Sequence, residues 1–303
     1  MKKLALCTMA VAGLLFASQG NSALASTGSA AANEGASLQK ETLQFGELIK
    51  KGDLYSINSS YDSFTYQLKQ TENAIGKVAG QKNRDKLNET YVRPAKIAKE
   101  RVIYEVSEYR LIHKTGIDLL NNETSLAGKK TRMLGRLAER AIQIKAAGYY
   151  ASIPSAIPQF LSASKGQLDN GKFVDAGKGT VSRFDYEVFI LTNMQRVKYK
   201  LSPLTLDVEL SGVAKKKSED MIAKGYFDHQ SPTYGSPFQM MEAFHIPYHY
   251  AGENIAMGYR SPADVVQGWM NSKDHRENIL KETYNRIGTG YSQNYWTQMF
   301  VGR

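Results

Sequence analysis

The first half of the chain has the pattern of amphipathic helices. From Leu38 to Tyr150, glycine and proline are sparse and apolar residues recur three and four positions apart. Two stripes show this spacing: Val102, Val106, Tyr109 and His113, then Leu134, Leu137, Ala141 and Ile144. Asn121-Asn122 separates them, and Pro94 suits a helix start or a kink. The pattern predicts an all-α bundle of three or four helices over residues 38–161.

The second half begins with helix signals of a different composition. We expect one helix over residues 186–201 and another over 206–224, the second closed by Gly225. A third helix starts with Ser261 as its N-cap, followed by a proline at the first helical position. We expect this helix to continue as far as His275 and the arginine after it.

Strand signals appear only near the C-terminus. The runs 286–292 and 295–301 are β-like, and Gln293-Asn294 forms the turn between them. Helices followed by paired strands predict an α+β domain over residues 184–303, with the helices placed around a small antiparallel sheet.

The ends and joints of these two regions have their own compositions. A basic start, an apolar run and the small-residue site "ALA" predict a signal peptide over residues 1–25. Cys7 lies inside it and leaves a lipoprotein signal as the alternative. The small polar residues 26–37 are expected to be a flexible spacer, and the Gly-, Ser- and Asn-rich residues 162–183 a linker between domains. No later segment is long and apolar enough to predict a transmembrane helix.

Cysteine and charge narrow the class of protein. The chain has 1 Cys, inside the expected signal, so we expect an exported bacterial protein without disulfides. Residues 26–183 carry 24 Lys and Arg against 16 Asp and Glu, a net charge of +8, whereas residues 184–303 carry 13 of each. The basic helical half favours anionic cell-wall polymers as partners. The alternative is that these charges only solvate helix faces. No nucleic-acid recognition module is visible.

Candidate chemistry lies in the second half. His229 stands in "DHQSPTYGSP", where two prolines and a glycine favour a rigid turn, and Glu253 stands in the Gly-bounded apolar run "YAGENIAMG". His275 is the third polar group. Two imidazoles and a carboxylate suit a divalent metal such as zinc, or a proton-transfer site. Asp228 is a candidate acceptor that would orient the His229 ring from behind.

The same residues belong to blocks that resemble a known family. In order, these are "TNMQRVKYKLSPL", "AKKKSEDMIAKGYFDHQSPTYGSP", "YAGENIA", "GWMNSKDHRENIL", "IGTGY" and "YWTQMF". Together they resemble the CAP superfamily (cysteine-rich secretory, antigen-five and pathogenesis-related proteins) in its bacterial, disulfide-free form. The resemblance implies a three-layer α-β-α sandwich with a polar cleft that His and Glu side chains enter. His229 and Glu253 match the first histidine and the GEN glutamate, and His275 matches a histidine of bacterial members.

Two departures weaken the transfer of zinc or lipid binding from relatives. Eukaryotic members have a histidine before the "YTQ"-like block, where this chain has Tyr295, which we keep as a candidate to support the site from behind. They also carry a second glutamate on the third helix, where residues 271–273 are Asn, Ser and Lys. Three interpretations therefore stay open: a structural hydrogen-bond network, a metal or ligand cleft, and a catalytic site. No nucleophile motif supports the third.

The helical half resembles another class more distantly. "KKGDLYSINSSYDSFTYQLKQTE" and "YVRPAKIAKERVIYEVSEYRLI" look like helical segments of S-layer proteins, in which such helices help to attach the protein to anionic wall polymers. The helix in "GKKTRMLGRLAERAIQIKAAG" could also lie on a membrane surface, although packing in a bundle suits it better. We therefore expect a secreted protein, either attached to the cell wall or free in the medium. It would belong to vegetative cells or to spores. It would bind an envelope ligand, or alternatively act as a metal-assisted hydrolase of envelope peptide or glycan bonds.

Overall fold

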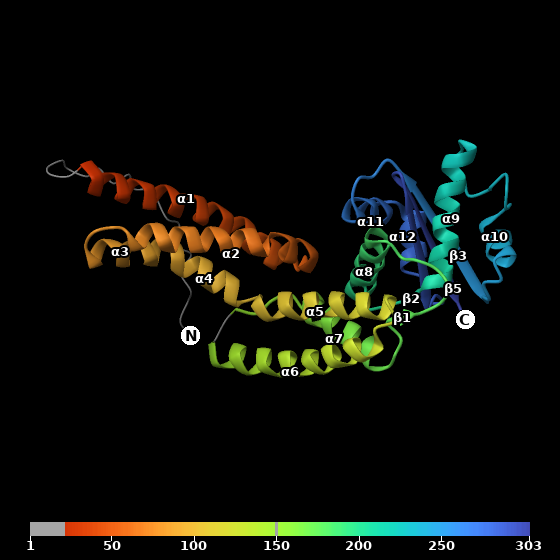
Figure 1. The fold of residues 1–303 in the computed structure, drawn as a ribbon, viewed down its shortest axis with the longest axis horizontal. Coiled ribbons are helices and arrows are strands. Elements are labelled where there is room, and N and C mark those ends of the chain that lie inside the picture. The colour runs from red at the N-terminus through yellow and green to blue at the C-terminus, as the bar shows by residue number, and fades with distance from the viewer. Residues whose placement is uncertain (1–21, 149–150) are drawn as a thin grey trace.

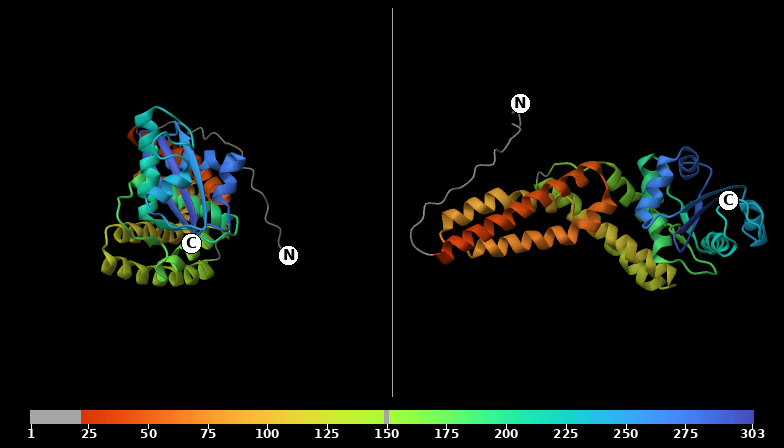
Figure 2. Two further views of the ribbon diagram at one scale, coloured as in Figure 1. Left: turned by 90° about the vertical axis from the view of Figure 1, so that its right-hand side faces the viewer. Right: turned by 90° about the horizontal axis from the view of Figure 1, so that it is seen from above.

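A computed structural model describes residues 22–148 and 151–303, so most of the expected signal peptide at residues 1–25 lies outside the described residues. The molecule is elongated, with a helical part at one end and a helix-covered sheet at the other (Figure 1). The view from above in Figure 2 shows the same division along the chain. The α+β class, with an all-α region before an α-β-α sandwich, is therefore confirmed.

The far end of the helical part is built from the first helices of the chain. Phe45 on the first helix stacks on Phe64 of the second at 4.4 Å between ring centres, and both are buried. Pro94 stands in the first turn of the last of these helices, directly after a π-helical segment, as the sequence suggested. The elements are α1 (Ser22–Lys51), α2 (Leu54–Gly76), α3 (Gln81–Leu87), η1 (Asn88–Val92) and α4 (Arg93–Glu100).

The expectation of a flexible spacer at residues 26–37 is wrong, because α1 runs through it. Ala31 is fully buried, and the Glu34 carboxylate accepts a hydrogen bond of 2.8 Å from Gln67 on α2. The small residues that suggested flexibility include several alanines, which have the highest helix propensity. Their lack of bulk lets α1 and α2 approach, and this tertiary contact is invisible in local composition.

The three helices that follow connect this bundle to the sheet: α5 (Ile103–Leu120), α6 (Thr124–Gly148) and α7 (Ala156–Asp169). The expected linker at residues 162–183 is also wrong in its first half, since α7 continues to Asp169. Phe173, inside the expected linker, is buried and packs edge-on against Phe189 at 5.4 Å between ring centres. The two parts of the molecule therefore share a continuous hydrophobic core.

The sheet has five strands in the order β1-β2-β4-β5-β3. It is mixed and not purely antiparallel as expected, because β1, β2 and β4 run parallel while β5 is antiparallel to both neighbours. The first two strands are two and three residues long, too short to leave a period-two signal. The strands are β1 (Val174–Asp175), β2 (Thr205–Asp207), β3 (Tyr250–Met257), β4 (Arg286–Ser292) and β5 (Tyr295–Gly302).

Helices cover both faces of this sheet (Figure 1). One layer is formed by α8 (Arg183–Lys198), α11 (Pro262–Asn271) and α12 (Lys273–Ile279), the other by α9 (Val208–Lys224) and α10 (Pro237–Ala243). Gly225 ends α9 in the left-handed conformation, and Ser261 caps α11, both as expected. The expected third helix is in fact two, because the chain turns extended at Ser272 before α12 begins.

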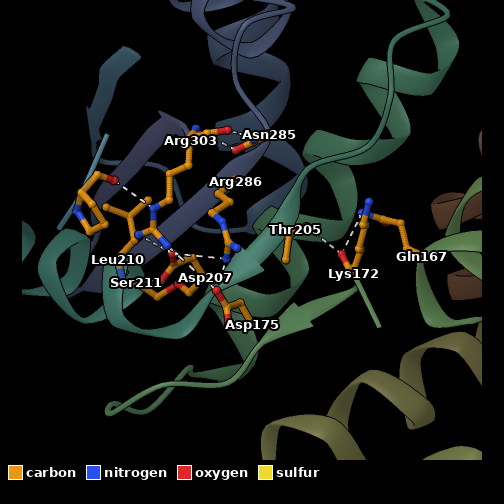
Figure 3. A network of polar contacts seen from close by, with 11 residues as sticks. Gln167, Lys172, Asp175, Thr205, Asp207, Leu210, Ser211, Asn285, Arg286 and Arg303 are labelled. Atoms are coloured by element: carbon orange, nitrogen blue, oxygen red, sulfur yellow. Dashed lines mark hydrogen bonds and ion pairs between the residues drawn. The ribbon is translucent and has the colours of Figure 1, made fainter. Parts of the chain in front are cut away.

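A charged network attaches β1 to the sheet (Figure 3). Arg286 on β4 pairs with Asp175 on β1, and Arg303 pairs with Asp207 at 2.9 Å. Asp207 also caps α9 by accepting the backbone N–H of Leu210. Two arginines and two aspartates thus hold the segment that leaves the helical part against the edge of the domain core.

Within residues 22–148 and 151–303, no helix combines the length and the hydropathy needed to span a bilayer.

Candidate functional site

The turn that carries His229 is held by its own side chains, as the sequence suggested. Ser231 Oγ accepts the backbone N–H groups of Thr233 and Tyr234 at 3.0 and 2.9 Å. Ser231 and Gly235 also exchange two backbone hydrogen bonds, and Gly235 adopts a positive φ of 75° that favours glycine. The backbone around His229 is therefore rigid.

Asp220, on α9, anchors this turn from below. Its buried carboxylate accepts hydrogen bonds of 2.7 Å from the hydroxyls of Tyr226, Ser231 and Thr233. Burial by itself would raise the pKa of Asp220, but the hydroxyl hydrogen bonds outweigh burial and lower it. The carboxylate stays ionised and links α9 to the turn at three points.

His229 and Glu253 come together across the domain. Nδ1 of His229 lies 2.7 Å from Oε1 of Glu253, within hydrogen-bond distance. The imidazole is 52% exposed, whereas the carboxylate on β3 is 2% exposed. Oε2 of Glu253 is buried without a hydrogen-bond partner. The pair thus presents a solvent-reachable ring whose charge state is governed by a buried acid.

The electrostatics of the pair follow from this difference in burial. Hydrogen bonding to Glu253 raises the pKa of His229 above its usual 6.5, against the opposing effect of partial burial. Burial raises the pKa of Glu253, although the contact with His229 counteracts it. The raised pKa favours the charged, protonated form of the His229 ring, which suits donation of a charged hydrogen bond to a ligand.

Lys217 on α9 is the third charged group of the site. Its side chain is buried, and Nζ donates to the backbone carbonyl of His229 at 2.8 Å and to the hydroxyl of Tyr226 at 3.2 Å. Burial lowers the pKa of Lys217, while the charges of Glu253 and Asp220 oppose that shift. The ammonium group compensates part of the negative charge buried beneath the turn.

The outer edge of β3 is closed by side chains from the segment that follows it. Tyr284 Oη donates to the carbonyl of Ala251, Asn278 Nδ2 to that of Glu253, and Trp269 Nε1 to that of Ile255, at 2.9, 3.1 and 3.2 Å. These are alternate carbonyls of an edge strand, which an added strand would otherwise use. The edge next to Glu253 is thus protected from pairing with another strand.

His275 lies near the pair but makes its own contact. Its Nδ1 is 2.8 Å from Oγ of Ser272, and its backbone carbonyl accepts a hydrogen bond from Asn254 at 3.0 Å. Burial lowers the pKa of His275, and the charge of His229 lowers it further. The two imidazoles are therefore close enough to repel each other when both are protonated.

Asp228 and Tyr295 take other positions than the supporting roles we expected. Asp228 Oδ1 accepts the backbone N–H of Gln230 at 2.7 Å, so its influence on the His229 ring is electrostatic and not a hydrogen bond. The Tyr295 ring packs against Phe227 at 6.3 Å between ring centres. His245 and His249 are exposed.

A metal centre needs three protein ligands around one point. Among the residues that the structure describes, no group of three or more His, Cys, Asp and Glu side chains is placed to hold an ion. The residues in this arrangement do not fit the zinc site that the sequence raised.

Sequence reasoning missed three residues of the site: Lys217, Asp220 and Asn278. Lys217 and Asp220 lie in the run "AKKKSED", where neighbouring charges are expected to face solvent on a helix. Their burial depends on the His229 turn folding over α9. For Asn278, the only available signal was its position inside the CAP-like block, since a single Asn has no distinctive sequence pattern.

The fold and the site define the class of this C-terminal region: an α-β-α sandwich whose buried glutamate meets a histidine from a distant turn. Residues 189–302 match the family described as the cysteine-rich secretory protein family, CAP. The chain therefore carries a CAP domain at its C-terminal end. Residues 19–96 match the SbsC C-terminal domain, in agreement with the S-layer resemblance of the helical half.

Individual relatives match over the same region. The chain is 53% identical over 126 residues to the uncharacterized protein YkwD of Bacillus subtilis, covering 41% of this chain and 49% of the relative. It is 40% identical over 117 residues to the uncharacterized membrane protein YlbC of Bacillus subtilis, covering 39% and 34%. The chain thus spans half or less of the length of these curated relatives.

Two solved structures are similar over a comparable share of the chain. An extracellular SCP-domain protein from Bacillus anthracis is 34% identical with a TM-score of 0.39, covering 39% of this chain and 40% of that one. An outer surface protein from Borrelia burgdorferi is 21% identical with a TM-score of 0.37, covering 41% and 98%.

Proposed function

We propose that this protein works outside the bacterial cell at the envelope, where its CAP domain binds an envelope component through His229 and Glu253, with His275 beside them. The observation that carries the proposal is the 2.7 Å contact between a half-exposed imidazole and a buried carboxylate whose second oxygen has no hydrogen-bond partner. A buried, unsatisfied acceptor is costly to keep, which is often a sign of a functional site.

The way the site is built supports binding. The rigid turn, the Asp220 and Lys217 contacts beneath it and the closed edge of β3 hold the imidazole in one place. Because the ring is already held in place, little conformational entropy is lost when it donates a hydrogen bond to a ligand. Because the outward carbonyls of β3 are already paired, a peptide ligand would not bind by adding a strand there.

The helical part is proposed to hold the protein at the wall. Its net charge of +8 over residues 26–183 favours anionic wall polymers over neutral ones. The expected signal peptide supports export, and a chain without cysteine in residues 26–303 suits a disulfide-free extracellular protein. A metal-assisted hydrolase would need three ligands around one ion, and no such group is placed together among the described residues.

The test is binding of the full chain to soluble fragments released from purified Gram-positive walls by muramidase. We expect His229→Ala and Glu253→Gln to lower the affinity by about tenfold or more, since the first removes the imidazole and the second removes the negative charge that keeps it protonated. His249→Ala changes an exposed histidine outside the pair and should bind normally. If His229→Ala and Glu253→Gln only lower the melting temperature and leave binding intact, the pair is structural and the proposal is wrong.

A further inference from the structure

The positive charge of the helical part is concentrated on one helix. Residues 124–148, which form α6, carry 6 Lys and Arg and a single Glu, a net charge of +5 out of the +8 of residues 26–183. By contrast, several cations of the remote bundle already have acidic partners, as in the pairs Lys96–Glu72 and Arg93–Glu89. The helix α6 also lies beyond residues 19–96, the segment that matches the SbsC domain.

The cations of α6 divide into two groups with different surroundings. Lys130 and Lys145 point inward and pair with the buried carboxylates of Asp118 and Glu105 on α5. The other four are exposed, and within residues 27–145 and 151–303 no ion pair includes them: Lys129, Arg132, Arg136 and Arg140. The inward pairs attach α6 to α5. The four outward cations form no ion pair that would stabilise the fold.

These four residues form a single row. At 100° per residue, positions 129, 132, 136 and 140 fall within about 80° of one another, and Arg132, Arg136 and Arg140 follow at one-turn intervals of roughly 6 Å. Three guanidinium groups along about 12 Å of helix, preceded by the ammonium group of Lys129, match a polymer with regularly spaced anionic groups, because each guanidinium can form two parallel hydrogen bonds to a phosphate. Figure 1 shows α6 on the outside of the molecule, away from the sheet.

A groove lies beside this row, between α6 and α7. It has a volume of about 450 Å³ and is lined by Gly128, Thr131, Arg132, Gly135, Lys165, Leu168 and Asp169. A methyl group added to Gly128 or Gly135 would enter this space, with no atom nearer than 3.8 Å. Arg132 stands on the α6 side of the groove, whereas on the α7 side Lys165 is paired with Asp169. The groove therefore adjoins the row through Arg132.

We propose that the row Lys129, Arg132, Arg136 and Arg140, together with the adjoining α6–α7 groove, is the binding site for a phosphodiester-linked anionic wall polymer of the teichoic type. This inference rests on the proposed attachment to the wall and assigns it to α6, outside the S-layer-like region. The polymer's phosphates bind the guanidinium groups in the row, and the groove takes a substituent or turn of the chain.

An anionic lipid surface also presents phosphate groups that could bind the row. The residues around the row, however, favour a wall polymer over a membrane surface. The side chains that point most directly away from the bundle are polar: Ser125, Arg132, Arg136 and Gln143. The exposed apolar residues of α6 lie on both flanks of that face: Leu126 and Met133 on one, at 41% and 54% exposure, and Ile142 on the other, at 72%. A helix lying in a membrane surface would place its apolar residues together along one face.

The test compares two variants of the full chain with equal loss of charge. One changes the row, K129Q/R132Q/R136Q/R140Q; the other changes four exposed lysines on α1, α2 and α3, K40Q/K51Q/K69Q/K82Q. Glutamine has nearly the helix propensity of arginine and lysine, so both variants should keep the wild-type melting temperature. Each is sedimented with purified Gram-positive walls, with walls stripped of phosphodiester polymer by hydrofluoric acid, and with phosphatidylglycerol vesicles.

We expect wild-type protein to bind intact walls, to lose that binding on stripped walls, and to be released by about 1 M salt, where the Debye length is about 3 Å. The row variant should bind intact walls more weakly by about tenfold or more, and the lysine variant within about threefold of wild type. If the lysine variant loses binding and the row variant keeps it, attachment is real and the site is wrong. If the wild-type protein does not sediment with intact walls, the proposed attachment to the wall is wrong. If it binds vesicles more strongly than walls, the row binds lipid and not a wall polymer.

Discussion

The buried ammonium group of Lys217 donates a hydrogen bond of 2.8 Å to the backbone carbonyl of His229. This contact joins α9 to the turn that carries the exposed imidazole, twelve residues further along the chain. Lys217 also lies 5.0 Å from the centre of the Tyr226 ring, in a cation–π arrangement. The position of His229 is therefore set by a helix as well as by its own turn.

Replacing Lys217 by Met should destabilise the protein and loosen the His229 turn. The change leaves the carbonyl of His229 and the hydroxyl of Tyr226 without their donor, which costs about 1–3 kcal/mol in a buried setting. Urea unfolding monitored by circular dichroism measures the loss. The matched control is Lys216→Met, one residue earlier and exposed, which should change stability by less than about 0.5 kcal/mol. Equal effects of the two variants would contradict the buried role of Lys217.

The two imidazoles should titrate on opposite sides of the usual value. The hydrogen bond to Glu253 raises the pKa of His229 above 6.5, whereas burial and the charge of His229 lower the pKa of His275 below it. Two-dimensional NMR of the imidazole protons across pH 4–9 should show this order. Glu253→Gln removes the acceptor charge and should bring the pKa of His229 down. A His229 titration unaffected by Glu253→Gln would show that the pair does not form in solution.

Stability should fall with rising pH because of His229. A group whose folded-state pKa is raised binds its proton more tightly in the folded state, so its contribution is fully present below the unfolded value of 6.5. That contribution is lost as the pH rises through the higher folded value. The difference in unfolding free energy between wild type and His229→Gln should therefore shrink as the pH rises from below 6.5 to above it. A difference that grows over this range would reverse the assigned sign.

Gly290→Ala should be among the most damaging single changes in the CAP domain. A Cβ atom at this position on β4 would lie 2.0 Å from the backbone nitrogen of Lys215, so α9 would have to move off the sheet. We expect a loss of about 3 kcal/mol or more, from disturbed packing across the α9 interface. Gly212→Ala is the control on α9 itself, where nothing lies within 4 Å of the added methyl. It should stabilise the protein by about 0.5–1 kcal/mol, since alanine favours the helix.

Sequence patterns were most reliable where the signal is local. The helix caps at Ser261 and Gly225 follow from the preferences of single residues and were confirmed. The turn at Gln293-Asn294 was also confirmed, since both residues adopt the positive φ of a tight hairpin, at 46° and 67°. Patterns failed at residues 26–37 and 162–169, where small or polar residues suggested flexible chain. Residues 26–37 are helical because they pack against α2, and residues 162–169 are helical because they pack against α8.

The sequence by itself determined the division into a basic helical half and a neutral α+β half, the caps at Gly225 and Ser261, the C-terminal hairpin, and the residue types of the candidate site. These depend on local spacing, capping and charge, which the chain carries wherever it folds. Only the tertiary structure decided that Glu253 meets His229 and that Lys217 is buried beneath them. It also decided that Lys130 and Lys145 pair inward while four cations of α6 face solvent. Such contacts join positions far apart in the chain, so their energies depend on which surfaces the fold brings together.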